Sequence, residues 1–381
     1  MRIGVLGGTF NPIHSAHMQM AQLALSSLSL DKVLFMVAAD PPHKAVAGHV
    51  PAETRLHMTA LASASLPGAE ACDLELSRSG KSYTADTLAL LAAQYPGATL
   101  YLIVGSDMLL DFPTWYHPER IVSLAHIACV PRRGQSARDE AAAEALRTAF
   151  LADVTFLPAE ADELSSTEIR TRFADALPVD GLLPAAVERY CYETGVYWPA
   201  PLRRTQALLR GALSEKRYRH TVGCVQTAVR LAALWGANAG QARLAALLHD
   251  CAKCLDPVTL EVLSGDDSGV ASVWHAFAGA VVAHNVYGVT DDAVLRAIRL
   301  HTTGDAGMTA LDSVVFYADL IEPGRSYPSV ALLRDAVARG PAAAVLLGLR
   351  RTRTFVAENG GVFHPASQRA IAYFEHMEGT D

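Results

Sequence analysis

The feature that most constrains the fold is a change of hydrophobic rhythm near the middle of the 381-residue chain. Before it, short apolar runs rich in β-branched residues alternate with helical patterns, and after it only helical patterns occur. The first pattern is typical of a parallel sheet covered by helices, and the second pattern is typical of an all-α domain. Because the chain is also longer than one ordinary core requires, we expect an α/β domain followed by an all-α domain.

The two halves can be divided into expected elements. Strands are expected at 2–8, 32–39, 99–107, 126–132 and 154–159, with helices between them at 53–65 and 84–94. Further helices are expected at 205–213, 217–235, 240–253, 291–300, 308–321 and 329–349. Pro199 and Pro201 oppose helix formation, so they predict a short linker between domains spanning 1–198 and 204–381.

Composition excludes several functional classes. The net charge of −7 creates no overall field that attracts nucleic acid or an anionic membrane, so phosphorylated ligands must be bound by local groups. No apolar run has the length of a membrane span, and the first residues form a strand pattern rather than a signal peptide. The six cysteines are spread over the chain, which favours reduced thiols and a cytoplasmic location. A homo-oligomer remains open.

The segment "LGGTFNPIHSAH" (6–17) directly follows the first expected strand. Its glycines allow the backbone to turn and approach a ligand, and a helix beginning near Ser15 would offer free N–H groups to phosphate. His14 and His17 are three residues apart and can face one side of that helix. The pattern indicates a nucleotide site, although an ordinary turn with two surface histidines remains the alternative.

Other polar residues follow the later strands. "DPPHK" (40–44) supplies Lys44, and "GSDMLLDFPTWYHPER" (105–120) supplies Asp107 and Trp115. "LSSTEIR" (164–170) has the pattern of a capped helix start that carries Arg170. Because the carboxyl ends of parallel strands meet at one edge of a sheet, we expect these residues to surround a single site.

These segments, with "SYTADTL" (82–88) and "LLPAAVERYCYETGVY" (182–197), resemble the motif set of nicotinate-nucleotide adenylyltransferase across residues 1–198. Asn11 replaces the usual Asp and Ala16 the usual Gly, but neither change removes a catalytic group. The resemblance implies a Rossmann-like nucleotidyltransferase fold. It also implies transfer of AMP from ATP to nicotinate mononucleotide with Mg²⁺, giving deamido-NAD and pyrophosphate.

The same resemblance implies roles for individual residues. The triphosphate would be held by basic side chains, namely His14, His17, Lys44 and Arg170. Other nucleotide contacts would come from Gly7, Gly8, Thr9, Phe10, Asp107, Ser166 and Thr167. Trp115 would stack on the pyridine ring, and backbone amides near Thr84 and Tyr116 would hold its carboxylate. Simple packing remains an alternative for Trp115. Another mononucleotide or phosphopantetheine remains an alternative acceptor.

In the second half, "LLHDCAKC" (247–254) places His249 and Asp250 at the end of an apolar helical pattern. Further candidate metal ligands lie in similar patterns, namely His220, His275, His301 and Asp319. An isolated histidine in an apolar helical pattern is usually a packed core residue. So many candidate ligands in such patterns are better explained by one metal-binding cluster. Cys251 and Cys254 have no second pair at zinc-site spacing, so we do not expect them to bind metal.

The order H…HD…H…H…D resembles the HD-domain metal phosphohydrolases. "HTTG" (301–304) and "ADLIEPGR" (318–325) narrow the resemblance, over about 204–350, to the bacterial family that hydrolyses diadenosine tetraphosphate to two ADP. It implies two transition metal ions, iron or else Mn or Zn, held by His220, His249, Asp250, His275, His301 and Asp319. His284 lies nine residues after His275, near the opposite side of any shared helix, so only one of the two should face the metals; the resemblance implies His275.

Asp250 would bridge the two ions. Lys253, four residues after His249 and so expected on its helical face, and Arg325 would neutralise the substrate phosphates. Glu322 is expected to orient Arg325 or a metal-bound water. Two alternatives remain for this half: hydrolysis of deoxynucleoside triphosphates or guanosine tetraphosphate, and a nucleotide-sensing module without catalysis.

Overall fold

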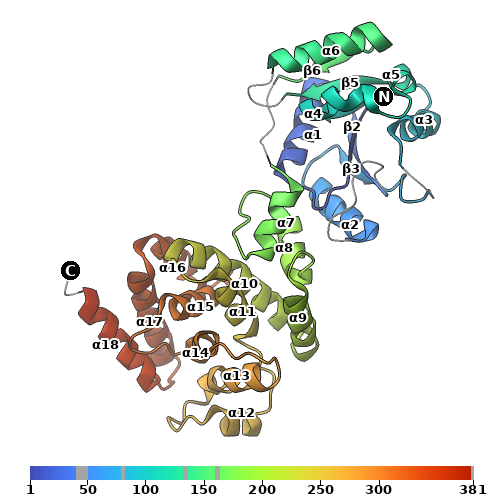
Figure 1. The fold of residues 1–381 in the computed structure, drawn as a ribbon. Coiled ribbons are helices and arrows are strands. Elements are labelled where there is room, and N and C mark those ends of the chain that lie inside the picture. Colours follow the sequence, from blue (N-terminus) through green and yellow to red (C-terminus); the bar gives the residue numbers. More distant parts are fainter. Residues whose placement is uncertain (40–49, 79–81, 132–135, 159–163, 379–381) are drawn as a thin grey trace. The chain divides into compact units, whose positions relative to one another are not determined.

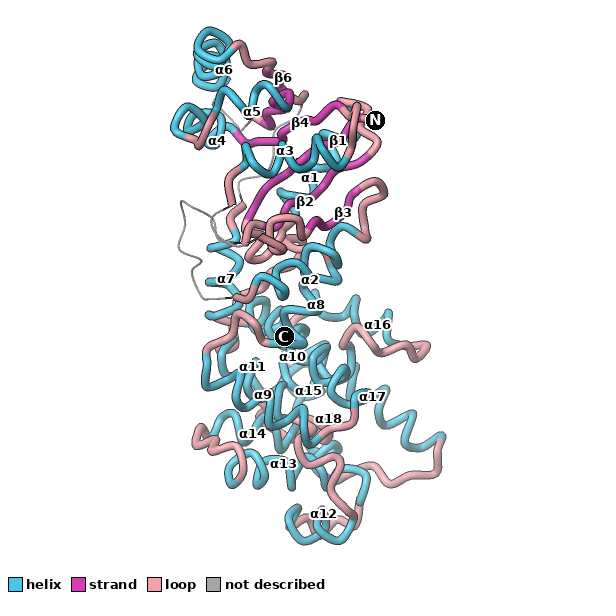
Figure 2. Tube along the Cα trace, turned by 90° about the vertical axis from the view of Figure 1, so that its right-hand side faces the viewer, coloured by secondary structure: helices cyan, strands magenta, loops and turns pink. Residues whose placement is uncertain are grey.

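The computed structural model describes residues 1–39, 50–78, 82–131, 136–158 and 164–378 (Figure 1). The chain divides into two compact units. The first comprises Met1–Thr171 and Val179–Tyr190, and the second comprises Arg172–Pro178 and Cys191–Asp381. The strands all belong to the first unit, and the described part of the second is helical (Figure 2). The expected sequence of an α/β domain and an all-α domain is therefore confirmed.

The first unit contains a parallel sheet with strand order β3-β2-β1-β4-β5-β6. Its strands are β1 (Arg2–Gly8), β2 (Lys32–Val37), β3 (Ala69–Cys72), β4 (Thr99–Gly105), β5 (Ala125–Val130) and β6 (Val154–Phe156). The five expected strands are confirmed, with some ends shorter than predicted. The sequence did not predict β3, because "AEAC" lacks the β-branched run of the other strands and β3 pairs only with β2, as an edge strand.

Helices connect these strands, and two more follow the last strand. Their bounds are α1 (Ser15–Ser27), α2 (Ala52–Ser63), α3 (Thr84–Gln94), α4 (Ser106–Asp111), η1 (Phe112–Thr114), α5 (Pro118–Leu124), α6 (Ser136–Phe150), α7 (Ser166–Ala174) and α8 (Ala185–Thr194). Ile3 and Val5 of β1 belong to a buried core with Leu88 of α3 and Leu109 of α4. Gly4 points to the other face of β1, where an added Cβ would lie 2.8 Å from Leu30 Cδ1.

The strand order reverses at β1, which pairs with β2 on one side and β4 on the other. The connections that leave β1 and β4 therefore run in opposite directions. In open parallel sheets this switch point leaves a crevice at the carboxyl ends of the two strands, where ligands bind. The segments after β1 and β4 carry two of the predicted nucleotide motifs.

The second unit is a set of packed helices. Their bounds are α9 (Ala200–Ala212), α10 (Glu215–Trp235), α11 (Ala239–Leu248), α12 (Pro257–Ser264), η2 (Ala271–Val273), α13 (Trp274–Asn285), α14 (Asp292–Leu300), α15 (Ala310–Ile321), α16 (Val330–Ala336), η3 (Val337–Arg339), α17 (Pro341–Glu358) and α18 (Pro365–Glu378). The long α10 is central and packs against both α11 and α15. Ser214 caps its start by accepting the Arg217 N–H, and Gly236 ends it at φ 70°.

Three local predictions in this half are wrong. Pro199 and Pro201 do not form a linker, because a proline is tolerated in the first turn and α9 begins at Ala200. The expected helix 329–349 is interrupted at Gly340, whose φ of 90° stops one helix before Pro341 begins α17. The expected helix 240–253 ends at Leu248 and is followed by turns, so Lys253 shares no helix with His249.

Among the described helices, none combines the length and apolar character needed to cross a bilayer.

Candidate functional sites

A cavity of about 710 Å³ lies in the first unit, at the carboxyl ends of β1 and β4. Residues of four predicted motifs line it together: Gly7, Gly8, Thr9, His14, His17, Thr84, Asp107, Trp115, Tyr116, Ser166, Thr167 and Arg170. Phe10 is buried instead, with its ring 5.0 Å from that of His17 and 5.7 Å from that of Phe35. Lys44 lies outside the described residues.

The two histidines lie at the start of α1. Their rings are stacked with centroids 3.7 Å apart, and the His14 backbone N–H donates to His17 Nδ1 at 3.2 Å. Burial lowers the pKa of His14 to about 4 and lowers the pKa of His17 well below its usual value. Both rings are therefore neutral at pH 7, and the His14 Nδ1 is buried without a hydrogen-bond partner among the described residues.

The start of α7 is joined to the loop after β1. Ser165 caps the helix by accepting the Glu168 N–H at 3.1 Å, and Ser166 Oγ donates to the Pro12 carbonyl at 2.9 Å. Arg170 donates to the Asn11 carbonyl at 2.8 Å and to Thr167 Oγ1 at 2.9 Å. These bonds bring a helix N-terminus and a guanidinium to the same cavity as the α1 histidines, a combination suited to phosphate.

Aromatic residues form another part of the cavity wall. Trp115 stacks on Phe112 with ring centroids 5.1 Å apart, and the Tyr83 and Tyr116 rings lie 4.3 Å apart. Glu75 also lines the cavity and accepts a hydrogen bond from Thr87 Oγ1 at 2.6 Å, while burial raises its pKa. Sequence reasoning missed Glu75, because a single acidic residue in a loop carries no pattern.

In the second unit, the predicted metal ligands come together from five elements. His220 lies on α10, His249 and Asp250 follow α11, His275 lies on α13, His301 follows α14, and Asp319 lies on α15. Four of them are fully buried: His249, Asp250, His275 and His301. Their convergence from separate helices shows that they form one cluster rather than isolated core histidines.

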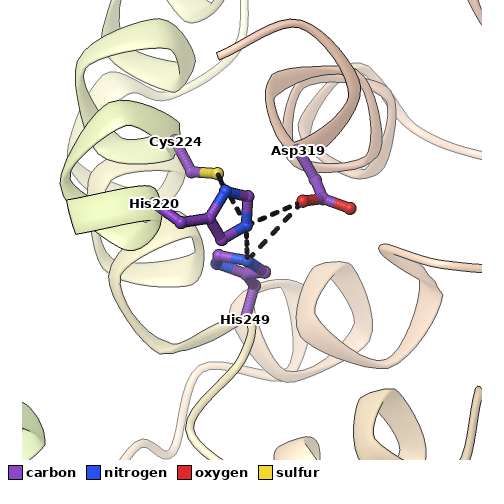
Figure 3. A group of neighbouring side chains, drawn as sticks. All are labelled: His220, Cys224, His249 and Asp319. Carbon is purple, nitrogen blue, oxygen red and sulfur yellow. Dashed lines mark hydrogen bonds and ion pairs between the residues drawn. The ribbon is translucent and has the colours of Figure 1, made fainter. Parts of the chain in front are cut away.

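One part of the cluster centres on His220 (Figure 3). Its Nε2 lies 2.9 Å from Asp319 Oδ1 and 3.3 Å from His249 Nε2. Cys224, one helical turn further along α10, places its Sγ 3.5 Å from the same nitrogen. The four donor atoms all lie within 4.8 Å of one another. Sequence reasoning missed Cys224, and burial raises the pKa of its thiol to about 12.

The other part centres on Asp250. Its Oδ1 lies 3.4 Å from His275 Nε2 and 3.7 Å from His301 Nε2, while its Oδ2 lies 3.7 Å from His249 Nε2. Burial favours the protonated carboxyl, but the electrostatic influence of the neighbouring His249 and His301 holds the pKa of Asp250 well below its usual range. An ionised carboxylate among imidazole nitrogens suits a bridging metal ligand.

Hydrogen-bond contacts of the Nδ1 atoms orient three of these histidines. His249 Nδ1 lies 2.7 Å from the Ala246 carbonyl, and His301 Nδ1 lies 2.7 Å from the Ile298 carbonyl. His220 Nδ1 lies 3.1 Å from Glu322 Oε1. A proton on each Nδ1 leaves Nε2 with a lone pair directed into the cluster, which is how metal-binding histidines are held. The residues therefore fit a metal centre. His284 instead pairs its Nδ1 with the Val289 carbonyl at 2.9 Å.

Cationic side chains border the cluster. Arg217 donates to Asp250 Oδ2 at 3.0 Å, and Arg325 donates to Asp319 Oδ1 at 2.6 Å. Lys253 Nζ lies 2.8 Å from His275 Nε2, and burial lowers its pKa. Sequence reasoning named Lys253 and Arg325 but missed Arg217, which gave no signal beyond its place one turn before His220.

Fold and sites together define a two-domain protein. Residues 5–172 match the cytidylyltransferase-like family model, and residues 217–324 match the HD domain model. A probable nicotinate-nucleotide adenylyltransferase of Geobacter sulfurreducens is 39% identical over 214 residues, which cover 52% of this chain and 98% of the relative. One of Synechococcus sp. is 40% identical over 201 residues, covering 51% and 94%. Through its first half, the chain belongs to the nicotinate-nucleotide adenylyltransferase family.

Solved structures resemble each half. Plasmodium falciparum nicotinic acid mononucleotide adenylyltransferase complexed with NaAD is 20% identical, with a TM-score of 0.44, over 51% of this chain and 97% of that one. A predicted HD superfamily hydrolase involved in NAD metabolism from Clostridium acetobutylicum is 34% identical, with a TM-score of 0.44, over 46% of this chain and 97% of that one.

Proposed function

We propose that the first half transfers AMP from ATP to nicotinate mononucleotide and that the second half hydrolyses diadenosine tetraphosphate to two ADP. The first assignment is supported by membership of the adenylyltransferase family and by one cavity that combines phosphate-binding groups with an aromatic wall. The second is supported by the HD domain and its buried His/Asp cluster, with the substrate inferred from the resemblance of "HTTG" and "ADLIEPGR".

In the transfer reaction, a phosphate oxygen of nicotinate mononucleotide attacks the α-phosphorus of ATP and pyrophosphate leaves. Such chemistry depends on positioning and on neutralising charge, and no covalent nucleophile is needed. His14, His17 and Arg170 would bind the triphosphate, with the free N–H groups of α7. Bound Mg²⁺ would supply further neutralisation, and Asp107 offers the kind of oxygen donor that it prefers.

Nicotinate would be recognised on the aromatic side of the cavity. Trp115 offers a ring face, and Thr84 begins α3, so its free N–H can donate a hydrogen bond to the substrate carboxylate. The test compares turnover of nicotinate and nicotinamide mononucleotide by the full chain. A strong preference for nicotinate is expected, because the uncharged amide gains little from a helix N-terminus. Equal turnover of the two would contradict the recognition we propose.

In the hydrolase half, the two ligand groups share His249, and Asp250, whose carboxylate lies 3.7 Å from His249 Nε2, would help to hold the metal ions. Metal ions at such sites polarise a phosphate and lower the pKa of a bound water. Arg217, Lys253 and Arg325 would neutralise substrate phosphate oxygens beside the carboxylates. Burial lowers the pKa of Lys253, and a nearby substrate phosphate would favour the charged form of its side chain.

The hydrolase is tested by metal analysis and ADP release on the purified chain supplied with iron or manganese. Asp250→Asn is expected to abolish ADP formation and leave AMP transfer intact, since Asp250 has no part in the first site. Deoxynucleoside triphosphates and guanosine tetraphosphate serve as competing substrates. If the metal-loaded chain cleaves none of these nucleotides but binds them, the second half is a sensing module and our proposal fails.

A further inference from the structure

Cys224 lies inside the metal cluster although no HD motif includes it. It follows His220 by one turn of α10, and its side chain is 1% exposed. Its Sγ lies 3.5 Å from His220 Nε2, in the same group of donor atoms as His249 and Asp319 (Figure 3). The thiol therefore occupies space next to the nitrogen that we assign to a metal.

The weak hydrogen-bond contact with His220 does not by itself account for this position. Both nitrogens of His220 already have carboxylate partners, Asp319 at 2.9 Å and Glu322 at 3.1 Å. The sulfur lies 3.5 Å from one of these nitrogens and 3.8 Å from the other, which places it beside the ring rather than in line with either lone pair. A buried apolar side chain would fill the same volume, so packing alone does not explain why a sulfur atom lies here.

The separations measured from His220 Nε2 suit tetrahedral coordination, while His249 Nε2 and Asp319 Oδ1 lie 4.0 Å apart and would have to draw closer around an ion. Metal–nitrogen and metal–oxygen bonds of about 2.05 Å imply donor separations of roughly 3.3 Å, and a metal–sulfur bond of about 2.3 Å implies a sulfur–nitrogen separation of roughly 3.6 Å. His220 Nε2 lies 3.3 Å from His249 Nε2, 2.9 Å from Asp319 Oδ1 and 3.5 Å from Cys224 Sγ.

We propose that Cys224 is the fourth protein ligand of the metal subsite formed by His220, His249 and Asp319. The inference rests on the metal centre of the proposed hydrolase and assigns it one sulfur-containing subsite and one that uses only nitrogen and oxygen. Coordination releases the thiol proton to solvent as the metal–sulfur bond forms. A thiolate favours zinc or ferrous iron over magnesium or manganese, so this subsite selects the softer metals.

The test replaces the native metal of the full chain with Co²⁺, because a thiolate ligand adds a sulfur-to-cobalt charge-transfer band to the spectrum. Cys224→Ser and Cys224→Val are compared with Cys251→Ala, a matched control whose buried thiol lies near the site but donates to the Gly279 carbonyl. The wild type and Cys251→Ala are expected to show the band, and both Cys224 variants to lose it. Bound cobalt is counted separately, and circular dichroism confirms folding.

The outcomes separate this inference from the hydrolase itself. Cobalt bound by the wild type without the band, or a band that persists in Cys224→Val, overturns the role of Cys224 and leaves the hydrolase standing. A wild-type chain that binds no cobalt, zinc or iron overturns both. For the metal preference, Cys224→Ser is expected to lose zinc affinity at least tenfold while its manganese affinity changes little. Equal losses for both metals contradict a soft sulfur ligand.

Discussion

Substitution of Gly223 by alanine tests how Glu322 supports the metal centre. Gly223 lies on α10 between His220 and Cys224, and an added Cβ would lie 2.5 Å from Glu322 Oε2 and 3.3 Å from its Cδ. Real Cβ atoms do not approach so closely, so the carboxylate must move. Glu322 is buried and also accepts the Gly324 N–H, and it has little room in which to move. Gly223→Ala therefore separates Glu322 from His220 without changing a metal ligand.

The expected effect is a loss of metal affinity. Disrupting a partner that orients a metal-binding histidine costs roughly 10- to 100-fold in affinity, or about 1.4–2.7 kcal/mol. The intrinsic helix preference acts in the opposite direction, because alanine is about 1 kcal/mol more favourable than glycine within a helix. Weaker metal binding without a matching loss of helix would thus identify the displaced carboxylate as the cause.

The assay is competition for zinc between the protein and a chromophoric chelator, with thermal unfolding of the metal-free chain recorded in parallel. Gly211→Ala on α9 is the matched control, because its Cβ would meet nothing within 4 Å. It is expected to keep wild-type affinity, while Glu322→Gln is expected to weaken binding as Gly223→Ala does. Wild-type zinc affinity in both Gly223→Ala and Glu322→Gln would refute the argument that Glu322 orients His220.

Three further predictions concern single residues. Trp115→Ala is expected to raise KM for nicotinate mononucleotide roughly tenfold and leave KM for ATP unchanged, because aromatic stacking contributes about 0.5–1.5 kcal/mol in addition to the burial of the rings. Steady-state kinetics with each substrate varied will measure both constants, and an equal rise in the two would count against stacking. Burial lowers the pKa of His14 to about 4, so the unfolded chain binds more protons between pH 6.5 and 4, and the free energy of unfolding declines as pH falls through this window. Denaturant titrations at a series of pH values should show a shallower decline for His14→Gln than for the wild type, and an equal slope would refute this. Arg217→Gln is expected to lower kcat/KM for ADP release about 10- to 100-fold, because a hydrogen bond to a charged group contributes about 1.5–3 kcal/mol. The AMP-transfer rate is the internal control, and a wild-type hydrolysis rate would show that Arg217 takes no part in hydrolysis.

Local sequence determined most of the architecture. Runs such as 2–8 and 99–107 became strands because β-branched and aromatic residues suit a pleated, buried backbone, and their glycine-rich ends became the loops that line the cavity. The α10 helix was predicted from its apolar periodicity, although two residues shorter at its start than the structure shows. The errors also have local causes: β3 is a short edge strand of small and polar residues, and Gly340 interrupts an apparently continuous helical pattern through its positive φ.

Only the tertiary structure decided which distant residues meet. The sequence indicated His249 and Asp250 through their adjacency, but Arg217 and Cys224 entered the site, and Glu322 came to pair with His220, because α10 packs against α11 and α15. Side-chain periodicity shows which face of a helix is buried, not which residue of another helix it will touch, since the relative rotation and shift of packed helices depend on all their side chains together. The chemistry of the metal centre is for that reason specified by packing as much as by motif.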